Sequence, residues 1–330
     1  MTTSSARALA ITGFAAAVTL GLAGCAGGSV DGGSAAPVAA DGLTPISIGV
    51  FTSPAVAVLQ AGEDQGFFED HGLDIEIIQA ASSAAQLPAL DSGKIQFMLA
   101  SPVSPILANT QGLDVQIVAG YAQNDPATVN DSTALVVGAG SDLQRPKDLE
   151  GKTVSINALG SVGEIGINAA VEADGGDPST IEYIQLALGD VPAALEAGQI
   201  AAGMTGAPWI GQVEAAGGSV LSDFIQEGGL GDNELVIAGN GTFAAENPEL
   251  TAEFVAALEE TYEYANANHD ALAATLPAIL NIPEEAAKKQ VWTHYSAELD
   301  PAVLGTFADL MTRYEIVPTE PDVDALIWKS

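Results

Sequence analysis

Residues 89–102 read ALDSGKIQFMLASP, and the same pattern returns at residues 194–208 as ALEAGQIAAGMTGAP. In both copies a helix ends at glycine, a short strand follows, and proline begins the next helix. The repeat predicts two equivalent βαβ lobes, each with a helix N-terminus beyond the carboxyl end of a strand. Ligands bind at such edges of open α/β sheets, because free backbone N–H groups converge there.

Strands and helices alternate on both sides of the repeat. We expect strands at 46–50, 73–78, 95–100, 115–120, 135–137, 153–156 and 181–186, and helices at 84–92, 103–110 and 162–173. Such alternation predicts an α/β protein with mostly parallel sheets covered by helices. From Pro248 onward we expect no further strand and four helices, near 248–267, 269–280, 283–296 and 301–314.

The composition argues against several classes of function. The 330 residues are enough for about two domains, and 43 acidic against 9 basic side chains give a formal net charge of −34. A nucleic-acid-binding protein needs a Lys/Arg surface that this chain cannot build. One cysteine and three well-separated histidines argue against a disulfide framework, a metal site and a nucleophile–histidine–acid catalytic set.

The N-terminal segment is typical of a secreted lipoprotein. Arg7 precedes an apolar stretch of small residues that ends in Leu22-Ala23-Gly24-Cys25, and this ending resembles the bacterial lipoprotein processing site. We interpret residues 1–25 as a lipoprotein signal peptide, with Cys25 as the lipid attachment site. Residues 26–43, rich in Gly, Ser and Ala, form a flexible tether. The mature protein is then extracytoplasmic, anchored by lipid to the outer face of the bacterial cytoplasmic membrane.

Five motifs in order resemble the solute-binding proteins of ABC importers, in the branch that takes up nitrate, sulfonates, taurine and thiamine pyrimidine precursors. They are GFFEDHGLDIE (66–76), ALDSGKIQFMLASP (89–102), DLEGKTV (148–154), ALEAGQI (194–200) and ENPEL (246–250). The resemblance implies a two-lobed periplasmic-binding-protein-like fold of type II, with a mostly parallel sheet and flanking helices in each lobe. Two crossing strands form the hinge.

We place these crossings near Ala134–Gly138 and Leu235–Thr242, where apolar strands lead into glycine-rich turns. Lobe I then covers residues 44–135 and 240–330, and lobe II covers residues 136–239.

The resemblance also implies the function. The chain is expected to be the extracytoplasmic solute-binding component of an ABC importer. It would be a monomer without cofactor or enzymatic activity that delivers a small solute to a membrane permease and its ATPase. The solute is a sulfonate-like anion or a small aromatic or heterocyclic compound. One alternative is a sensing subunit for the same kind of ligand. Another is an enzyme similar to the pyrimidine synthases of this fold, which is disfavoured because their Cys-rich iron motif is missing.

The predicted solute site lies in the loops that follow the strands. By matching position, the candidate ligand-binding residues are Phe51, Thr52, Ser53, Ser101, Tyr121, Asn124, Asn157, Gly160, Ser161 and Trp209. These loops contain no Lys or Arg, which disfavours an arginine clamp on an anion, although helix N-termini and hydroxyls can hold one. Ala207 stands where many relatives carry an acidic residue, which argues against a cationic ligand. We expect Ser101 and Trp209 to contact the solute from opposite lobes.

Overall fold

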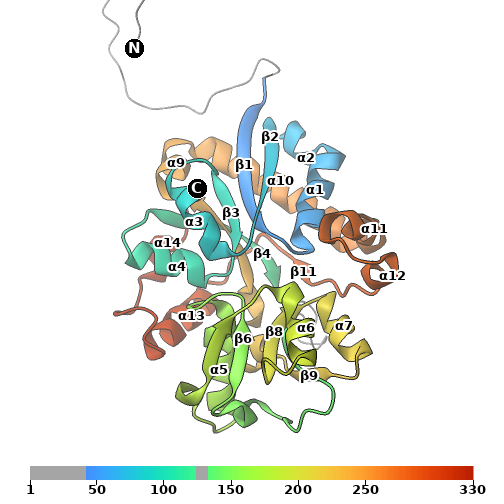
Figure 1. The fold of residues 1–330 in the computed structure, drawn as a ribbon. Coiled ribbons are helices and arrows are strands. Elements are labelled where there is room, and N and C mark those ends of the chain that lie inside the picture. The colour runs from blue at the N-terminus through green and yellow to red at the C-terminus, as the bar shows by residue number, and fades with distance from the viewer. Residues whose placement is uncertain (1–41, 124–132, 330) are drawn as a thin grey trace, which may run out of the picture. The chain divides into compact units, whose positions relative to one another are not determined.

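The computed structural model describes residues 42–123 and 133–329, and its strands form two sheets (Figure 1). The first, sheet A, has the order β11-β4-β10-β3-β1-β2. Its strands are β1 (Thr44–Phe51), β2 (Leu73–Ala80), β3 (Phe97–Ala100), β4 (Val115–Gln123), β10 (Leu235–Asn240) and β11 (His294–Tyr295). The second, sheet B, has the order β7-β6-β8-β5-β9. Its strands are β5 (Thr133–Val137), β6 (Thr153–Ile156), β7 (Glu182–Gln185), β8 (Ala202–Gly206) and β9 (Ser219–Ser222). The α/β class predicted from the sequence is confirmed.

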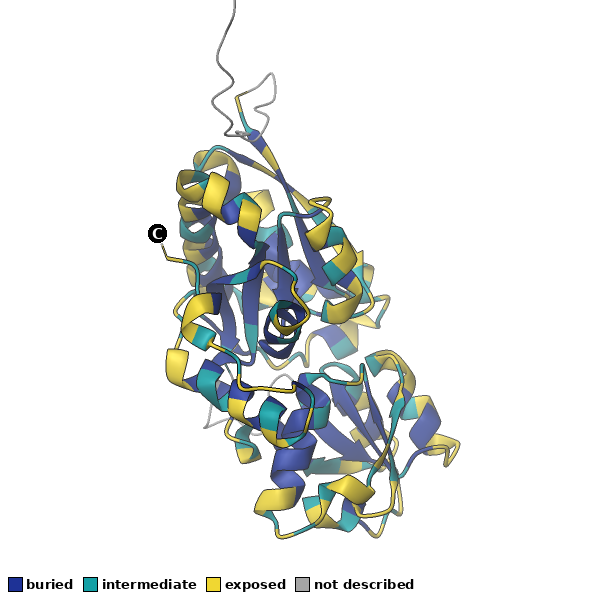
Figure 2. Ribbon diagram, turned by 90° about the vertical axis from the view of Figure 1, so that its left-hand side faces the viewer, coloured by how far each residue is buried: buried dark blue, intermediate teal, exposed yellow. Residues whose placement is uncertain are grey.

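Helices connect and accompany the strands of both sheets. Those between or after strands of sheet A are α1 (Ala55–Gln65), α2 (Phe67–Asp70), α3 (Ser83–Asp91), α4 (Val103–Thr110), α9 (Gly241–Glu246), α10 (Pro248–Ala267), α11 (His269–Leu280), α12 (Glu284–Ala287), α13 (Pro301–Arg313) and α14 (Val323–Leu326). Those of sheet B are α5 (Val162–Ala173), α6 (Val191–Glu196), α7 (Trp209–Ala215) and α8 (Phe224–Glu227). Figure 2 shows buried strands in both sheets and exposed outer faces on many helices.

The sequence repeat corresponds to α3-β3-α4 in the first sheet and α6-β8-α7 in the second. Gly93 and Gly198 follow the two helices with φ of 70° and 66°, a left-handed conformation that glycine adopts without strain. Pro102 and Pro208 directly precede α4 and α7. The repeat therefore places two equivalent strand-to-helix turns, one in each sheet.

Each sheet contains one inserted strand of opposite direction. Strand β10 lies between β3 and β4 and is antiparallel to both, and β5 lies in the same way between β8 and β9. The pairs β1–β2, β1–β3, β6–β7 and β6–β8 are parallel. Both inserted strands are the first that the chain forms after it passes from one sheet to the other. Because each sheet contains both parallel and antiparallel strand pairs, both sheets are mixed.

The two strands expected at the hinge are part of the sheets. Strands β5 and β10, expected to cross between lobes, lie inside sheets B and A. The strand before β5 in the chain is β4 of sheet A, and the strand before β10 is β9 of sheet B. Residues 133–135 are therefore part of sheet B, and residues 235–239 are part of sheet A. The physical reason is that a hinge strand and a central strand are equally apolar, so the sequence pattern does not distinguish them.

The C-terminal region also differs from the prediction. Helices 248–267 and 269–280 agree with α10 and α11, but the helix expected near 283–296 is limited to Glu284–Ala287. Strand β11 follows and pairs antiparallel with β4. Its Tyr295 is 4% exposed and packs edge-on against Tyr121 at 5.4 Å between ring centroids. This two-residue strand depends on tertiary contacts rather than on local sequence.

The hydrophobic cores show how the two sheets are joined. Sheet A packs on α1 and α10, where the rings of Phe97 and Phe254 stack at 4.0 Å. In the core of lobe II, α5 and β6 pack with α4 and with α13, through Phe307 and Met311 among others. Helix α13 was assigned to lobe I from the sequence, but its Val303, Phe307, Leu310 and Met311 belong to this shared cluster, while its Leu304 packs with Ile117 and Val236 of sheet A.

A histidine in the turn after α2 makes stability depend on pH. His71 Nδ1 lies 2.6 Å from Glu253 Oε2, and Nε2 lies 3.2 Å from Glu260 Oε1. The hydrogen bond to Glu253, helped by Glu260, raises the pKa of His71 above its ordinary value of 6.5. Protonated His71 therefore stabilises the fold fully below 6.5, and the contribution is lost as the pH rises through the raised pKa.

We expect His71→Gln to lower the free energy of unfolding by less than about 1 kcal/mol at about pH 6, because both carboxylates are half exposed. The same variant should have no effect at about pH 9. Urea unfolding at both pH values measures this, with the exposed His294→Gln as control. Equal destabilisation at the two pH values would contradict the role given to the charged ring.

Candidate functional site

A pocket of about 140 Å³ lies where the strand-to-helix turns of both sheets meet. Sheet A contributes the turns after β1 and β3, the end of β4 and the first residues of α3. Sheet B contributes the start of β5 and the turns after β6 and β8. The two copies of the sequence repeat thus provide two of its walls. This is the arrangement in which α/β proteins bind small ligands.

The pocket brings together most of the residues that the sequence suggested. Those that line it are Phe51, Ser53, Ser101, Tyr121, Asn157, Gly160, Ser161 and Trp209. Thr52 does not line it, because its side chain is exposed and its hydroxyl donates to Gln79 Oε1 at 3.3 Å. Asn124 and Cys25 lie outside the described residues. Contact of the lining residues with a solute stays a prediction.

Aromatic side chains form walls on both sides of the pocket. Trp209 is the first residue of α7 and is partly exposed. One side of its indole covers Gly189, where an added Cβ would lie 3.3 Å from the ring. Phe51 ends β1 and also packs against the core of lobe I. Both rings can therefore offer an apolar face to a small molecule.

Several buried polar atoms of the lining have no hydrogen-bond partner among the described residues. They are Tyr121 Oη, Asn157 Oδ1, Ser161 Oγ and Gln290 Oε1. Burial also raises the pKa of Tyr121 well above its ordinary value, so its hydroxyl stays protonated and can donate. An unsatisfied buried polar group costs about 1–3 kcal/mol. A bound molecule that pairs with these atoms would recover part of that cost.

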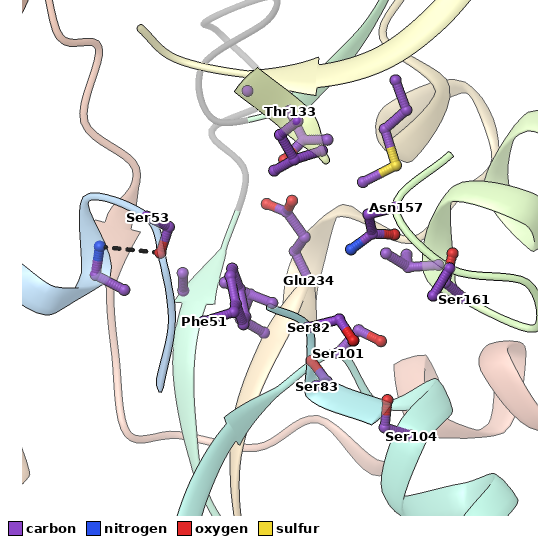
Figure 3. Close-up of a pocket in the computed structure, with 18 of the residues that line it drawn as sticks. Phe51, Ser53, Ser82, Ser83, Ser101, Ser104, Thr133, Asn157, Ser161 and Glu234 are labelled. Carbon is purple, nitrogen blue, oxygen red and sulfur yellow. Dashed lines mark hydrogen bonds between the residues drawn. The ribbon is translucent and has the colours of Figure 1, made fainter. Parts of the chain in front are cut away.

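Serines stand at the helix starts around the pocket (Figure 3). Ser53 Oγ accepts a hydrogen bond from the backbone N–H of Ala55 at 3.3 Å, and Ser82 Oγ accepts one from Ala85 at 3.3 Å. These side chains satisfy N–H groups of α1 and α3. By contrast, Ser161 makes no such cap at the start of α5. The starts of α4 and α7 likewise have no side-chain cap.

The structure adds a site residue that the sequence did not predict, the one charged side chain among the described residues that line the pocket. Glu234, which immediately precedes β10, lines the cavity and is 3% exposed. The sequence analysis placed the hinge at Leu235–Thr242, next to Glu234, and used only the absence of an acidic residue at Ala207 to argue against a cationic ligand. No sequence motif marks Glu234, and only the pairing of β10 with β3 and β4 brings it to the pocket. Ser82, Ser83 and Thr133 are further lining residues that the pattern did not indicate.

Across 42–123 and 133–329, no group of three or more His, Cys, Asp or Glu side chains is arranged to hold a metal ion. Within the same ranges, none of the helices combines the length and apolar character that a bilayer span requires.

Solved structures with the same fold include two bacterial binding proteins. The alkanesulfonate-binding protein SsuA from Xanthomonas axonopodis pv. citri, bound to MOPS, is similar with a TM-score of 0.76 and 19% identity, covering 90% of this chain and 100% of that chain. The periplasmic nitrate-binding protein NrtA from Synechocystis PCC 6803 is similar with a TM-score of 0.71 and 16% identity, covering 86% of this chain and 84% of that chain. These similarities confirm the predicted two-lobed periplasmic-binding-protein-like fold.

A curated relative has a different description. The chain is 25% identical over 221 residues to a Candida albicans (strain WO-1) protein named 4-amino-5-hydroxymethyl-2-methylpyrimidine phosphate synthase. The match covers 61% of this chain, and the chain spans only 60% of the length of that relative. Residues 53–271, more than half of the chain, match the family described as NMT1/THI5 like, and the chain therefore belongs to this family.

Proposed function

We propose that the protein is the solute-binding component of an ABC importer, which captures one small organic molecule between its two lobes. The observation that carries the proposal is the pocket built from equivalent strand-to-helix turns of both sheets, with unpartnered polar atoms on its walls. Proteins of the same fold that are described as alkanesulfonate- and nitrate-binding support this role. The cavity suits a small solute rather than a polymer.

A ligand screen by thermal unfolding tests the proposal. A molecule that binds only the folded state stabilises it by RT ln(1 + [L]/Kd), which is about 2.7 kcal/mol at a hundredfold excess over Kd. We expect at least one class of sulfonates, nitrate, pyrimidines or small aromatic compounds to raise the unfolding temperature. Calorimetry should then show one bound molecule per chain. The bound compound should be recovered chemically unchanged. A screen in which none of these compounds stabilises the protein would contradict the proposal.

A second candidate is a synthase similar to the Candida albicans relative, which the sequence match favours. The only cysteine of the chain is Cys25, in the proposed signal peptide, and the described lining of the pocket contains no His or Cys. These residue types are common catalytic groups, so binding without turnover is the better-supported function. Formation of a product from any stabilising compound would decide for the enzyme.

We infer further that the mature chain begins at Cys25, is held at the outer face of the cytoplasmic membrane by lipid on that residue, and acts as a monomer. Residues 26–43 would be the tether, and a permease with its ATPase would be the membrane partner. The support is the apolar segment that ends in Leu22-Ala23-Gly24-Cys25 and the Gly/Ser/Ala-rich sequence after it.

This anchor leads to a direct prediction. Cys25→Ala should move the protein from the membrane fraction to the soluble fraction, because the residue that would carry the lipid is gone. Immunoblots of fractionated cells measure the distribution, with Ser29→Ala in the tether as the matched control. The folded domain should keep its unfolding temperature. A Cys25→Ala protein that still sediments with membranes would show that the lipoprotein interpretation is wrong.

A further inference from the structure

Tyr121 carries a hydroxyl that the described fold does not use. The residue lies near the end of β4, lines the pocket and is 2% exposed. Its Oη has no hydrogen-bond partner among the described residues. Three other lining residues also have an unpartnered buried atom, namely Asn157, Ser161 and Gln290, but each of them is partly exposed. Of these four residues, only Tyr121 is more than nine-tenths buried.

Strand β4 has a bulge at Tyr121. Ala122 pairs with Leu235 of β10. Gly120 pairs with Val236, the next residue of β10, so that Tyr121 is left without an opposite residue. A bulge interrupts the alternation of side chains across a sheet and redirects the extra residue, and bulges are frequent next to active sites. The strand therefore departs from regular geometry at a residue that lines the pocket.

Two neighbouring rings hold the side chain of Tyr121 in place. The rings of Tyr262 in α10 and Tyr295 in β11 meet it edge-on, each at 5.4 Å between centroids. All three residues belong to the same buried cluster of lobe I. A phenol oxygen lies on the axis about which its ring turns, so a ring flip does not move it. Close packing around the ring therefore fixes the position of Oη.

The hydroxyl of Tyr121 keeps its proton. Burial raises the pKa of Tyr121 well above its ordinary value of 10, and the phenols of Tyr295 and Tyr262 raise it further. A protonated phenol can donate one hydrogen bond, and the described residues provide no acceptor for it. A buried donor without an acceptor destabilises the folded state. Phenylalanine would fill the same space without this penalty, so the hydroxyl has no evident role in folding.

We propose that the hydroxyl of Tyr121 determines the specificity of the site by donating a hydrogen bond to an acceptor atom of the solute, either an oxygen or a ring nitrogen. A molecule that presents only N–H donors at this point would leave the hydroxyl unpaired. The inference rests on the proposed solute-binding function and adds the chemistry of one end of the ligand. It also means that the empty protein is less stable at Tyr121 than it could be, as is common at functional sites.

Unfolding without ligand tests whether the hydroxyl serves the fold. Tyr121→Phe should unfold at the same temperature as the wild-type protein or at a higher one, because an unpaired buried group is removed. The matched control is Tyr262→Phe, which does not line the pocket and loses a hydroxyl that donates to Gly120 O at 3.4 Å. This control should unfold at a lower temperature. If Tyr121→Phe were destabilised as much as Tyr262→Phe, the inference would be wrong.

Probes that share a phenyl ring test the chemistry of binding. Benzamide, benzoate and benzenesulfonate present acceptor oxygens, whereas benzylamine presents an ammonium group and no acceptor. We expect at least one of the first three to raise the unfolding temperature of the wild-type protein, and benzylamine to have no effect. Calorimetry with the most stabilising probe should show about tenfold weaker binding to Tyr121→Phe. Tyr262→Phe should keep the wild-type affinity.

The outcomes distinguish the inference from the function on which it rests. Equal affinity of the wild-type protein and Tyr121→Phe for a stabilising probe would overturn the inference and leave the solute-binding function intact. Stabilisation by benzylamine alone would do the same. If neither these probes nor the compounds of the wider screen stabilise the wild-type protein, the solute-binding function and the inference are both contradicted.

Discussion

Replacing Phe254 with alanine is expected to lower the free energy of unfolding by about 3–5 kcal/mol. The side chain is fully buried, and its ring lies parallel to that of Phe97 at 4.0 Å and 6.1 Å from that of Phe68. Alanine would leave a cavity between α10 and sheet A and would remove both ring contacts. Urea unfolding followed by circular dichroism measures the change.

The matched control is Phe243→Ala, whose ring meets Phe97 edge-on at 5.8 Å and is only partly buried. Phe243→Ala should lower the free energy of unfolding clearly less than Phe254→Ala. Because α4 and α13 share a core cluster with lobe II, we expect both lobes to unfold in one transition even in the weakened protein. A Phe254→Ala variant as stable as Phe243→Ala would show that the stacked rings are not central to the core.

Trp209→Ala has the largest expected effect on binding. Loss of an aromatic wall from a desolvated pocket commonly costs about 2 kcal/mol, which corresponds to roughly a thirtyfold weaker affinity. Ser101→Ala on the opposite lobe should weaken the binding free energy by less, about 1 kcal/mol for a hydrogen bond to a neutral group of the solute. Calorimetric titration of a compound that stabilises the wild-type protein measures both variants.

Trp328→Ala is the matched control, because Trp328 packs against the core of lobe I and does not line the pocket. It should lower the unfolding temperature and leave the affinity unchanged. If Trp209→Ala behaved in the same way, its indole would be part of the packing around Gly189 and not a wall of the binding site.

The sequence predicted those elements whose signals are local. These signals are Gly93 and Gly198, which follow helix ends, and the prolines that precede α4 and α7. Each of them depends on the conformation of a single residue. Helix 162–173 was predicted with the bounds that α5 has. Because these signals recur in both halves of the chain, they also indicated which loops would meet, and Ser101 and Trp209 both line the pocket.

The features that sequence reasoning missed depend on contacts between distant segments. Strand β11 exists because Tyr295 packs against Tyr121 and Tyr262, far away in the sequence. Glu234 reaches the pocket only because β10 inserts between β3 and β4. An acidic residue before an apolar strand usually faces solvent. Its burial here follows from the topology, which no local pattern shows.

One small solute is expected to bind between the two lobes, against Trp209. The chain has three tryptophans, so the double variant Trp292→Phe and Trp328→Phe leaves Trp209 as the only indole fluorophore. Titration with a stabilising compound should change its emission and saturate at one molecule per chain. Binding detected by calorimetry while the emission of Trp209 stays constant would contradict the claim.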